Sequence, residues 1–177
     1  MKSISVLIAV LIVSAIIASN YINLDFGEKM TITIGYPAFW GPLVPAQQCT
    51  AYGDSVLSNQ FEALVRIGQD HLIHPLAAKS WIISDDFKKI TFKIDTSKKF
   101  SNGEALSAQH FKKSWEYGVQ LETSSHNEST LEILSYIEGF DQFKDTGEIS
   151  GIVTVDNETL VVNFTKSFRL ALDNFAV

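Results

Sequence analysis

Three runs of sequence carry the signals that decide the fold: FEALVR at residues 61–66, PLAAKSWIISDDFKKITFKI at 75–94 and FSNGEALSA at 100–108. In the second run, apolar residues at 81–83 and 90–94 flank SDDF at 84–87. This pattern predicts a β-hairpin, because Ser and Asp side chains hydrogen-bond to nearby backbone N–H groups in turns. In the third run, Asn102-Gly103 predicts a tight turn, since both residues tolerate positive φ.

Helices are expected on both sides of this hairpin. Before it, apolar residues recur at helical spacing, with Asp54 or Ser55 as the N-cap. They are Val56, Leu57, Phe61, Leu64 and Val65. After it, Ser107 is expected to cap a helix that runs to about Gly118. A short helix is predicted at residues 130–137, and one more helical turn at 140–143 before Gly147.

Strands are predicted near both ends of the chain. Residues 31–34 alternate polar and apolar side chains, which predicts a short strand ended by Gly35 and Pro37. A proline-rich aromatic loop is expected at 36–49. The last pattern is a hairpin with strands at 152–155 and 160–164 and a turn at 156–158. Mixed helices and antiparallel hairpins predict an α+β fold.

The order of these motifs, with Gly139, Gly147, Gly151-Ile152 and Thr159-Leu160 near the C-terminus, resembles a known family. It is similar to the extracytoplasmic solute-binding proteins of ABC importers that capture oligopeptides, dipeptides and nickel. The resemblance covers about residue 32 to the end. It implies a type II periplasmic-binding-protein fold of the α+β (α/β) class. The chain would hold an incomplete first lobe with the extra subdomain of the peptide-binding subgroup.

The resemblance also implies an organisation of the chain. Residues 20–48 would begin the first lobe, 49–149 would form its additional subdomain, and 150–177 would return into the lobe and stop there. Members of the family are several times longer, so the chain is expected to be an N-terminal fragment. Half of a two-lobed clamp would bind little by itself, because closure around the ligand needs both lobes.

The function implied by the resemblance is solute capture outside the cytoplasmic membrane. The expected partners are a peptide or other small solute and the permease subunits of an ABC transporter, and the protein is expected to be a monomer. Ligand contacts in the family lie near the end of the first strand, which here places them at Tyr36, Phe39 and Trp40. The alternative for these aromatic residues is packing over the edge of the core.

The N-terminus predicts export. Lys2 is followed by an uncharged apolar run at residues 4–18, which suits a secretory signal peptide over residues 1–19. The run is shorter than the roughly 20 residues that span a bilayer. Because isoleucines occupy the −3 position of the possible cleavage sites, an uncleaved anchor stays open. The alternative functions are then a membrane-anchored interaction module or a non-functional truncated product.

Catalysis, metals and nucleic acids have little support in the residues. His71 and His74 form an H-x-x-H pair, but no third ligand follows at a metal-like spacing. Turn formation explains Asp85-Asp86, and no nucleophile elbow or phosphate-binding glycine loop occurs. The formal net charge of −6 argues against a nucleic-acid partner. The expectation is therefore no enzyme activity, no metal and no cofactor.

Two positions depart from the family pattern. An acidic residue usually completes the capping box three residues after the helix cap, but this chain has His110. After the second hairpin strand the family often has Leu-Arg-x-Gly, where this chain has IDTS at residues 94–97. Both changes are expected to affect stability and turn geometry more than function.

Overall fold

The computed structural model describes residues 33, 35, 43–45, 51–122 and 133–176 of the 177-residue chain. The chain divides into two compact units, residues 1–35 and 36–177. Every described helix and strand belongs to the second unit. The strand predicted at residues 31–34 falls almost entirely outside the described residues.

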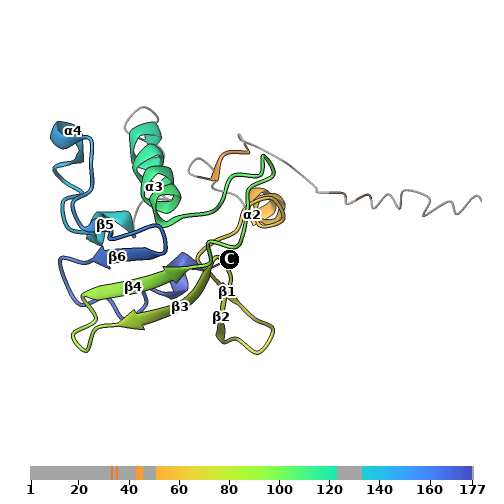
Figure 1. The fold of residues 1–177 in the computed structure, drawn as a ribbon, viewed down its shortest axis with the longest axis horizontal. Helices are drawn as coiled ribbons and strands as arrows, with labels where there is room; N and C mark the ends of the chain where they lie inside the picture. Colours follow the sequence, from red (N-terminus) through yellow and green to blue (C-terminus); the bar gives the residue numbers. More distant parts are fainter. Residues whose placement is uncertain (1–32, 34, 36–42, 46–50, 123–132, 177) are drawn as a thin grey trace, which may run out of the picture. The chain divides into compact units, whose positions relative to one another are not determined.

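A four-stranded antiparallel sheet with strand order β3-β4-β6-β5 is the centre of the second unit (Figure 1). Its strands are β3 (Ala78–Ile83), β4 (Lys89–Ile94), β5 (Ile152–Thr154) and β6 (Thr159–Asn163). Both predicted hairpins are therefore confirmed. The terminal hairpin pairs with the first through β4 and β6, with Phe92 opposite Leu160. The sheet thus contains strands from both sides of residues 149–150, where the additional subdomain was expected to end. The position of that boundary stays a prediction.

Alternation along the strands gives the sheet one buried face. Ile90, Phe92 and Ile94 of β4 are buried, whereas Lys89 and Lys93 between and beside them are exposed. This is the period of two that a half-buried strand requires. The core continues through the buried apolar residues of β6 and the C-terminal segment, including Leu160, Val162, Phe164, Leu172 and Phe175.

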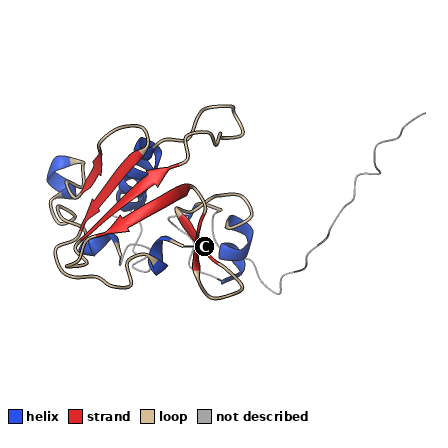
Figure 2. Ribbon diagram, turned by 60° about the horizontal axis from the view of Figure 1, so that its bottom comes forward, coloured by secondary structure: helices blue, strands red, loops and turns tan. Residues whose placement is uncertain are grey.

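Helix α3 (Ala108–Glu122) covers the buried face of the sheet and packs against β5 and β6 (Figure 2). It begins directly after Ser107, as predicted, and ends four residues beyond Gly118. Its Lys112 and Glu116 form an ion pair at 3.2 Å with both side chains only 14% exposed. The Lys112 Nζ donates to the carbonyl oxygen of Ile152, and the Glu116 carboxylate accepts from the Ile149 backbone N–H. This pair therefore attaches the helix to the start of β5.

The first helix differs from the prediction. Helix α2 spans Ala51–Leu57 and is followed by a turn, so the expected helix through Val65 is wrong. Leu64 and Val65 are buried in extended chain instead, and Val65 begins strand β1 (Val65–Ile67). This strand pairs with β2 (Ile73–Pro75) in a two-stranded sheet. Val65 thus reaches the core from a strand and Leu64 from the bend directly before it, which their helical spacing did not reveal.

Short helices connect α3 to the terminal hairpin and close the chain. They are the 3₁₀ helix η2 (Leu134–Tyr136), the α-helix α4 (Phe143–Thr146) and the 3₁₀ helix η3 (Asp173–Phe175). The helix predicted at 130–137 is therefore a single 3₁₀ turn within the described residues. A helical turn before Gly147 is confirmed, but α4 occupies residues 143–146 and not 140–143, and Gly147 caps it with a φ of 73°.

Gly151 lies where two backbone segments come close together. A Cβ atom at this position would lie 2.7 Å from the carbonyl oxygen of Glu138 and 2.8 Å from that of Asn163. The Gly151 N–H donates to Glu138, and the Asn163 N–H donates to the Gly151 carbonyl. Only glycine fits this contact without moving the backbone.

None of the helices among the described residues is long and apolar enough to cross a membrane.

Candidate functional site

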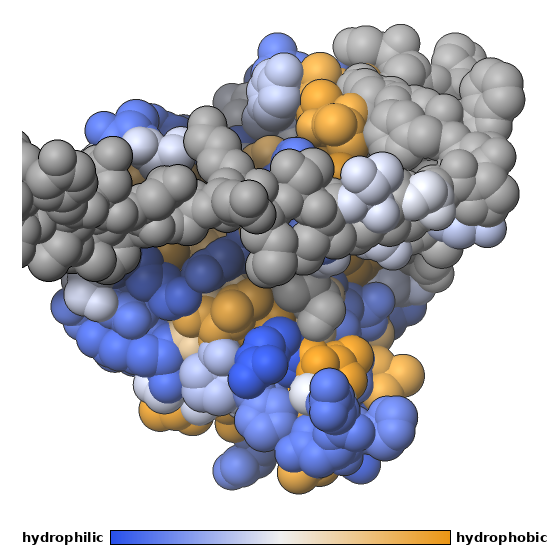
Figure 3. Space-filling view, turned by 90° about the vertical axis from the view of Figure 1, so that its right-hand side faces the viewer, coloured by the Kyte–Doolittle hydropathy of each residue, from blue (hydrophilic) through white to orange (hydrophobic). Residues whose placement is uncertain are grey.

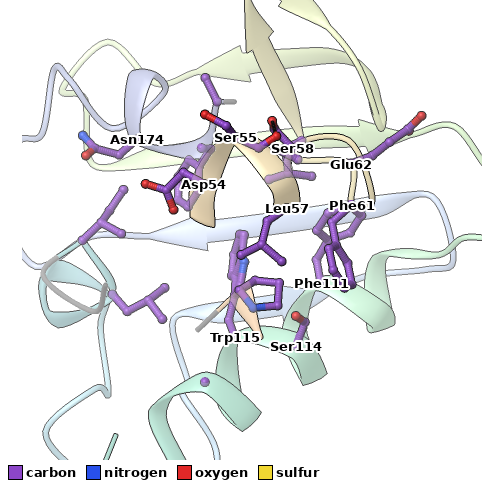
Figure 4. A pocket seen from close by; sticks show the side chains of 18 residues that line it. Asp54, Ser55, Leu57, Ser58, Phe61, Glu62, Phe111, Ser114, Trp115 and Asn174 are labelled. Carbon is purple, nitrogen blue, oxygen red and sulfur yellow. Dashed lines mark hydrogen bonds between the residues drawn. The ribbon is translucent and has the colours of Figure 1, made fainter. Parts of the chain in front are cut away.

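A pocket of about 680 Å³ opens between α2, α3 and the C-terminal 3₁₀ helix (Figure 4). Five separate segments of the chain contribute to it. Its lining residues are Pro45, Asp54, Ser55, Leu57, Ser58, Phe61, Glu62, Ala63, Leu64, Phe111, Ser114, Trp115, Gly118, Ile133, Leu134, Asn174, Phe175 and Ala176. Its volume lies in the range of small-molecule sites.

The floor of the pocket is aromatic. Phe111 and Trp115 share one face of α3 because they are four residues apart, and their rings meet edge to face at 6.3 Å. Trp115 stacks on Phe175, with ring centroids 5.1 Å apart and an interplanar angle of 19°. Phe61 lies beside Phe111 in the view of Figure 4 and is 49% exposed. These rings offer flat apolar surface to a ligand.

The rim of the pocket is polar. Glu62 is paired with Lys98, whose Nζ lies 2.7 Å from the Glu62 carboxylate. The Asn174 side chain donates to the carbonyl oxygen of Leu170, and Ser58 donates to that of Ser55. An apolar floor with a few polar groups at its edge suits an amphipathic small molecule.

Ser107, His110 and Glu104 form a connected network at the start of α3. The Nδ1 atom of His110 accepts the Ser107 backbone N–H at 3.1 Å and lies 2.8 Å from the Ser107 hydroxyl. Because Nδ1 is an acceptor, the neutral ring carries its proton on Nε2, which donates to the Glu104 carboxylate at 3.1 Å. The order hydroxyl–imidazole–carboxylate is that of a nucleophile, a base and its orienting acid.

The backbone contact decides what this network does. In a capping box, the third helical residue accepts the backbone N–H of the cap residue, and His110 does so here with its ring nitrogen. The lone pair that would take a hydroxyl proton is therefore already engaged by the backbone. His110 replaces the acid of the family pattern in its structural function, which the sequence did not suggest.

The two histidines of the H-x-x-H pair do not converge on a metal. His74 lies in β2 and its Nε2 contacts the Asp70 carboxylate at 2.9 Å. His71 lies in the connecting turn with a φ of 59°. Within the described residues, no three His, Cys, Asp or Glu side chains come together in a group that could hold a metal ion.

The Asp85-Asp86 pair lies in the β3–β4 turn, as predicted. The pKa of Asp86 is lowered, first by a hydrogen bond from the Ser84 hydroxyl and then by one from the Lys88 backbone N–H. A lowered pKa keeps this carboxylate ionised and suits turn formation, because a general acid at neutral pH needs a raised one. The side chain thus stabilises the hairpin.

The predicted ligand residues Tyr36, Phe39 and Trp40 lie outside the described residues. Their contact with a ligand stays a prediction. The pocket itself was not predicted from the sequence, which indicated only a helix from Ser107 to about Gly118 in the segment that holds Phe111 and Trp115. Phe61 was expected on the apolar face of a helix, so the sequence did not indicate that its side chain would be half exposed at a pocket.

Figure 3 shows the side of the molecule that carries α2 and the β1–β2 hairpin. Hydrophobic surface is visible there between hydrophilic side chains. The β1–β2 hairpin contributes two exposed aliphatic residues, Ile67 and Leu72. Apolar surface on this side is therefore not confined to the pocket.

Comparison with known proteins gives one family match and several relatives. The profile described as "Bacterial extracellular solute-binding proteins, family 5 Middle" matches residues 73–177. The dipeptide-binding protein DppE of Bacillus subtilis is 39% identical over 59 residues, which is 33% of this chain and 11% of that protein. The nickel-binding periplasmic protein of Escherichia coli is 38% identical over 78 residues, 44% of this chain and 15% of that protein.

Solved structures with the same fold include oligopeptide-binding proteins. The substrate-binding domain of an oligopeptide ABC transporter from Bacillus anthracis has a TM-score of 0.64 and 26% identity, over 74% of this chain and 25% of that one. OppA of Haemophilus influenzae, in complex with the peptide RPPGFSPFR, has a TM-score of 0.61 and 28% identity. The match covers 72% of this chain and 25% of that one. The similarity to these structures shows that the chain has part of the type II periplasmic-binding-protein fold. The chain spans about a quarter of these structures.

Proposed function

Since this chain belongs to the bacterial extracellular solute-binding proteins of family 5, we propose that the protein captures peptides or related small solutes outside the cytoplasmic membrane. It would deliver them to the permease subunits of an ABC importer. The observation that carries this proposal is the family match over residues 73–177. The peptide-bound relative with the same fold supports a peptide as the solute.

The described residues would act mainly as the scaffold of the first lobe. The solute contacts are assigned to the aromatic loop, at Tyr36, Phe39 and Trp40. Pro45 follows Trp40 by five residues in the sequence and lines the pocket.

The pocket chemistry also suits a peptide. Aromatic rings from α3 and the C-terminal segment can cover an apolar side chain, and the polar rim can hydrogen-bond to peptide groups. The protein would bind and release this ligand unchanged, without enzyme activity, metal or cofactor. It would act as an exported monomer in the periplasm or on the extracytoplasmic side, brought there by the N-terminal signal.

Calorimetric titration of the native protein from the extracytoplasmic fraction tests the proposal. The probes are the dipeptide alanylphenylalanine, the nonapeptide RPPGFSPFR and a nickel–histidine chelate. We expect saturable, reversible binding of at least one of the two peptides, with the peptide recovered intact. Binding of the nickel chelate alone, or cleavage of a peptide, would contradict the proposal.

Substitution of the aromatic loop tests the assigned contacts. Trp40→Ala is expected to weaken peptide binding about tenfold, as for a buried aromatic contact in an interface. Tyr117→Ala is the matched control, because Tyr117 is an aromatic residue of α3 that is 55% exposed and does not line the pocket. Equal losses in both variants would remove the loop from the ligand site.

A further inference from the structure

One end of the four-stranded sheet gathers positive charge in a chain whose formal net charge is −6. The segments at residues 87–93 and 163–170 contain five basic residues and no acidic ones. Four of them, Lys88, Lys89, Lys166 and Arg169, lie at the end of the sheet where β4 begins and β6 ends. We call these four residues the basic end.

Backbone contacts hold the two segments side by side. Lys89 is the register partner of Asn163 in the pairing of β4 with β6. The Phe164 N–H donates to the Lys88 carbonyl at 2.7 Å, and the Phe168 N–H donates to that of Phe87 at 2.9 Å. Charges distant in sequence are thus fixed at one end of the sheet.

Aromatic rings position two of the cations. The Arg169 guanidinium lies over the Phe87 ring at 4.6 Å, and the Lys166 ammonium lies over the Tyr136 ring at 4.1 Å. Tyr136 in turn packs edge to face on Phe168 at 5.1 Å. Such cation–π contacts orient a cation without neutralising it, so both charges still attract anions.

Exposed aliphatic side chains accompany this charge. Leu170 follows Arg169 directly and is 65% exposed. Ile82 of β3, one residue from the β3–β4 turn, is 73% exposed. Surfaces that bind anionic membranes combine lysine and arginine with exposed apolar residues such as leucine. The basic end has both kinds of side chain.

The acidic residues of the turn offset only part of the charge. Asp86 is held inside the turn, where its carboxylate accepts from the Ser84 hydroxyl at 2.6 Å and from the Lys88 N–H at 3.1 Å. Asp85 is exposed beside it. Glu138 lies at this end as well, because its N–H donates to the carbonyl of Asn163 at 3.0 Å, and it is exposed. Counting the four cations against the carboxylates of Asp85, Asp86 and Glu138 leaves a net charge of +1 at this end of the sheet, opposite in sign to the whole chain.

We propose that the basic end, with Leu170 and Ile82, docks the protein on the anionic phospholipid surface of the membrane. The argument for a membrane is the combination of point charges with exposed aliphatic side chains, since lysines at a bilayer interact with phosphates while apolar residues enter the acyl boundary. The inference rests on the proposed delivery of solute to a permease in the membrane.

Vesicle partitioning of the full chain tests this docking. Phosphatidylcholine vesicles are compared with vesicles that contain about 30% phosphatidylglycerol. The apolar N-terminal run contributes to both, so the ratio of the two partition coefficients isolates the electrostatic part. We expect a clear preference for anionic vesicles that salt abolishes. In the double variant Lys166→Gln/Arg169→Gln the preference for anionic vesicles should fall about 25-fold, because each charge contributes roughly fivefold.

The matched control is Lys113→Gln/Lys144→Gln, which removes the same charge from exposed positions on α3 and α4. It should keep the preference. Asp85→Asn should raise the preference several-fold, which keeps the test valid if the double variant folds poorly. Equal partitioning into both vesicles, or equal losses in the double variant and its control, would overturn the proposal. Binding to an acidic polypeptide such as polyglutamate without binding to anionic vesicles would overturn it as well. Because no peptide is present, this result is separate from the test of solute binding.

Discussion

Phe92 in the central sheet and Phe61 on the pocket wall are both phenylalanines in predicted motifs, yet their surroundings differ completely. Phe92 is fully buried and meets the Phe175 ring edge to face at 5.7 Å. Phe61 is 49% exposed at the mouth of the pocket. The apolar side chain in the sheet is thus shielded from solvent, whereas the one on the pocket wall leaves apolar surface exposed.

This difference indicates how the molecule divides its tasks. Burial of apolar area supplies most of the free energy of folding, and many of the buried core residues lie in β4, β6 and the C-terminal segment. Apolar surface left at a concave site can instead contribute to ligand binding. We therefore expect substitutions in the sheet to change stability, and substitutions on the pocket wall to change binding.

The sharpest test of this division compares the two phenylalanines. Phe92→Ala should lower the free energy of unfolding by about 3–5 kcal/mol, because it leaves a cavity in a closed core. Phe61→Ala should lower it by less than about 1 kcal/mol, as for an exposed residue. Urea denaturation followed by circular dichroism measures both. Similar losses in the two variants would break the comparison.

A second test concerns the close contact inside the sheet. Gly151→Ala should cost about 2 kcal/mol, because its Cβ would press on two backbone oxygens at 2.7 and 2.8 Å. Gly103→Ala is the control, since its φ of 88° is strained for alanine but no atom lies within 4 Å. The control should lose about 1 kcal/mol. If Gly103→Ala proves the more harmful, the contact at Gly151 is looser than described.

The start of α3 gives a smaller effect, because this cap lies outside the closed core. His110→Ala should lower stability by about 1 kcal/mol through loss of the contact with the Ser107 N–H. His110→Glu should restore most of it, since glutamate is the usual partner in a capping box. Thermal unfolding of the three proteins at neutral pH decides the matter. A glutamate variant no better than alanine would show that the network is not a cap.

The smallest effect is expected at the β5–β6 turn. The pKa of Asp156 is lowered below its ordinary value of 3.8, first by the Thr159 hydroxyl and then by the Glu158 backbone N–H. A lowered folded-state pKa stabilises the fold above pH 3.8 and loses that contribution as the pH falls through the folded value. Wild type should therefore exceed Asp156→Asn slightly in stability at pH 7, and the gap should close below pH 3.8. A gap that is constant with pH would contradict this assignment.

The hairpins could be predicted because their signals are local. Ser84, Asp86 and Asp156 bond to backbone groups within five residues, so the turn and its chemistry appear together in the sequence. The flanking alternation then fixes which face is buried. The family resemblance rests on these same motifs, and the profile match over residues 73–177 confirms it.

The segment after α2 could not be predicted in this way. Its residues Leu64 and Val65 satisfy helical spacing, but their partners are distant. The Leu64 carbonyl accepts from the Ala78 N–H, and Val65 forms a parallel bridge with Ala176. Val65 also pairs with Pro75 in the two-stranded sheet. Backbone pairing with segments that lie 10 to 111 residues further along the chain overrides local spacing and leaves no mark in a short window.

The pocket and the His110 cap were missed for related reasons. A pocket lined by five segments exists only after those segments have packed. His110 looked like a departure because the pattern calls for a carboxylate at that position. An imidazole nitrogen is also an acceptor when it is unprotonated, and the short distance to Ser107 shows this use.

Hydrogen–deuterium exchange of the native protein, with and without the nonapeptide RPPGFSPFR, tests the division between closed scaffold and binding wall most directly. The account predicts that the amides of β4 and β6 exchange slowest in both states. The amides of α2 and of residues 61–64 should exchange faster and become protected when the peptide is added. Peptide protection that appears only in the sheet, or exchange in β4 and β6 as fast as in α2, would contradict the account.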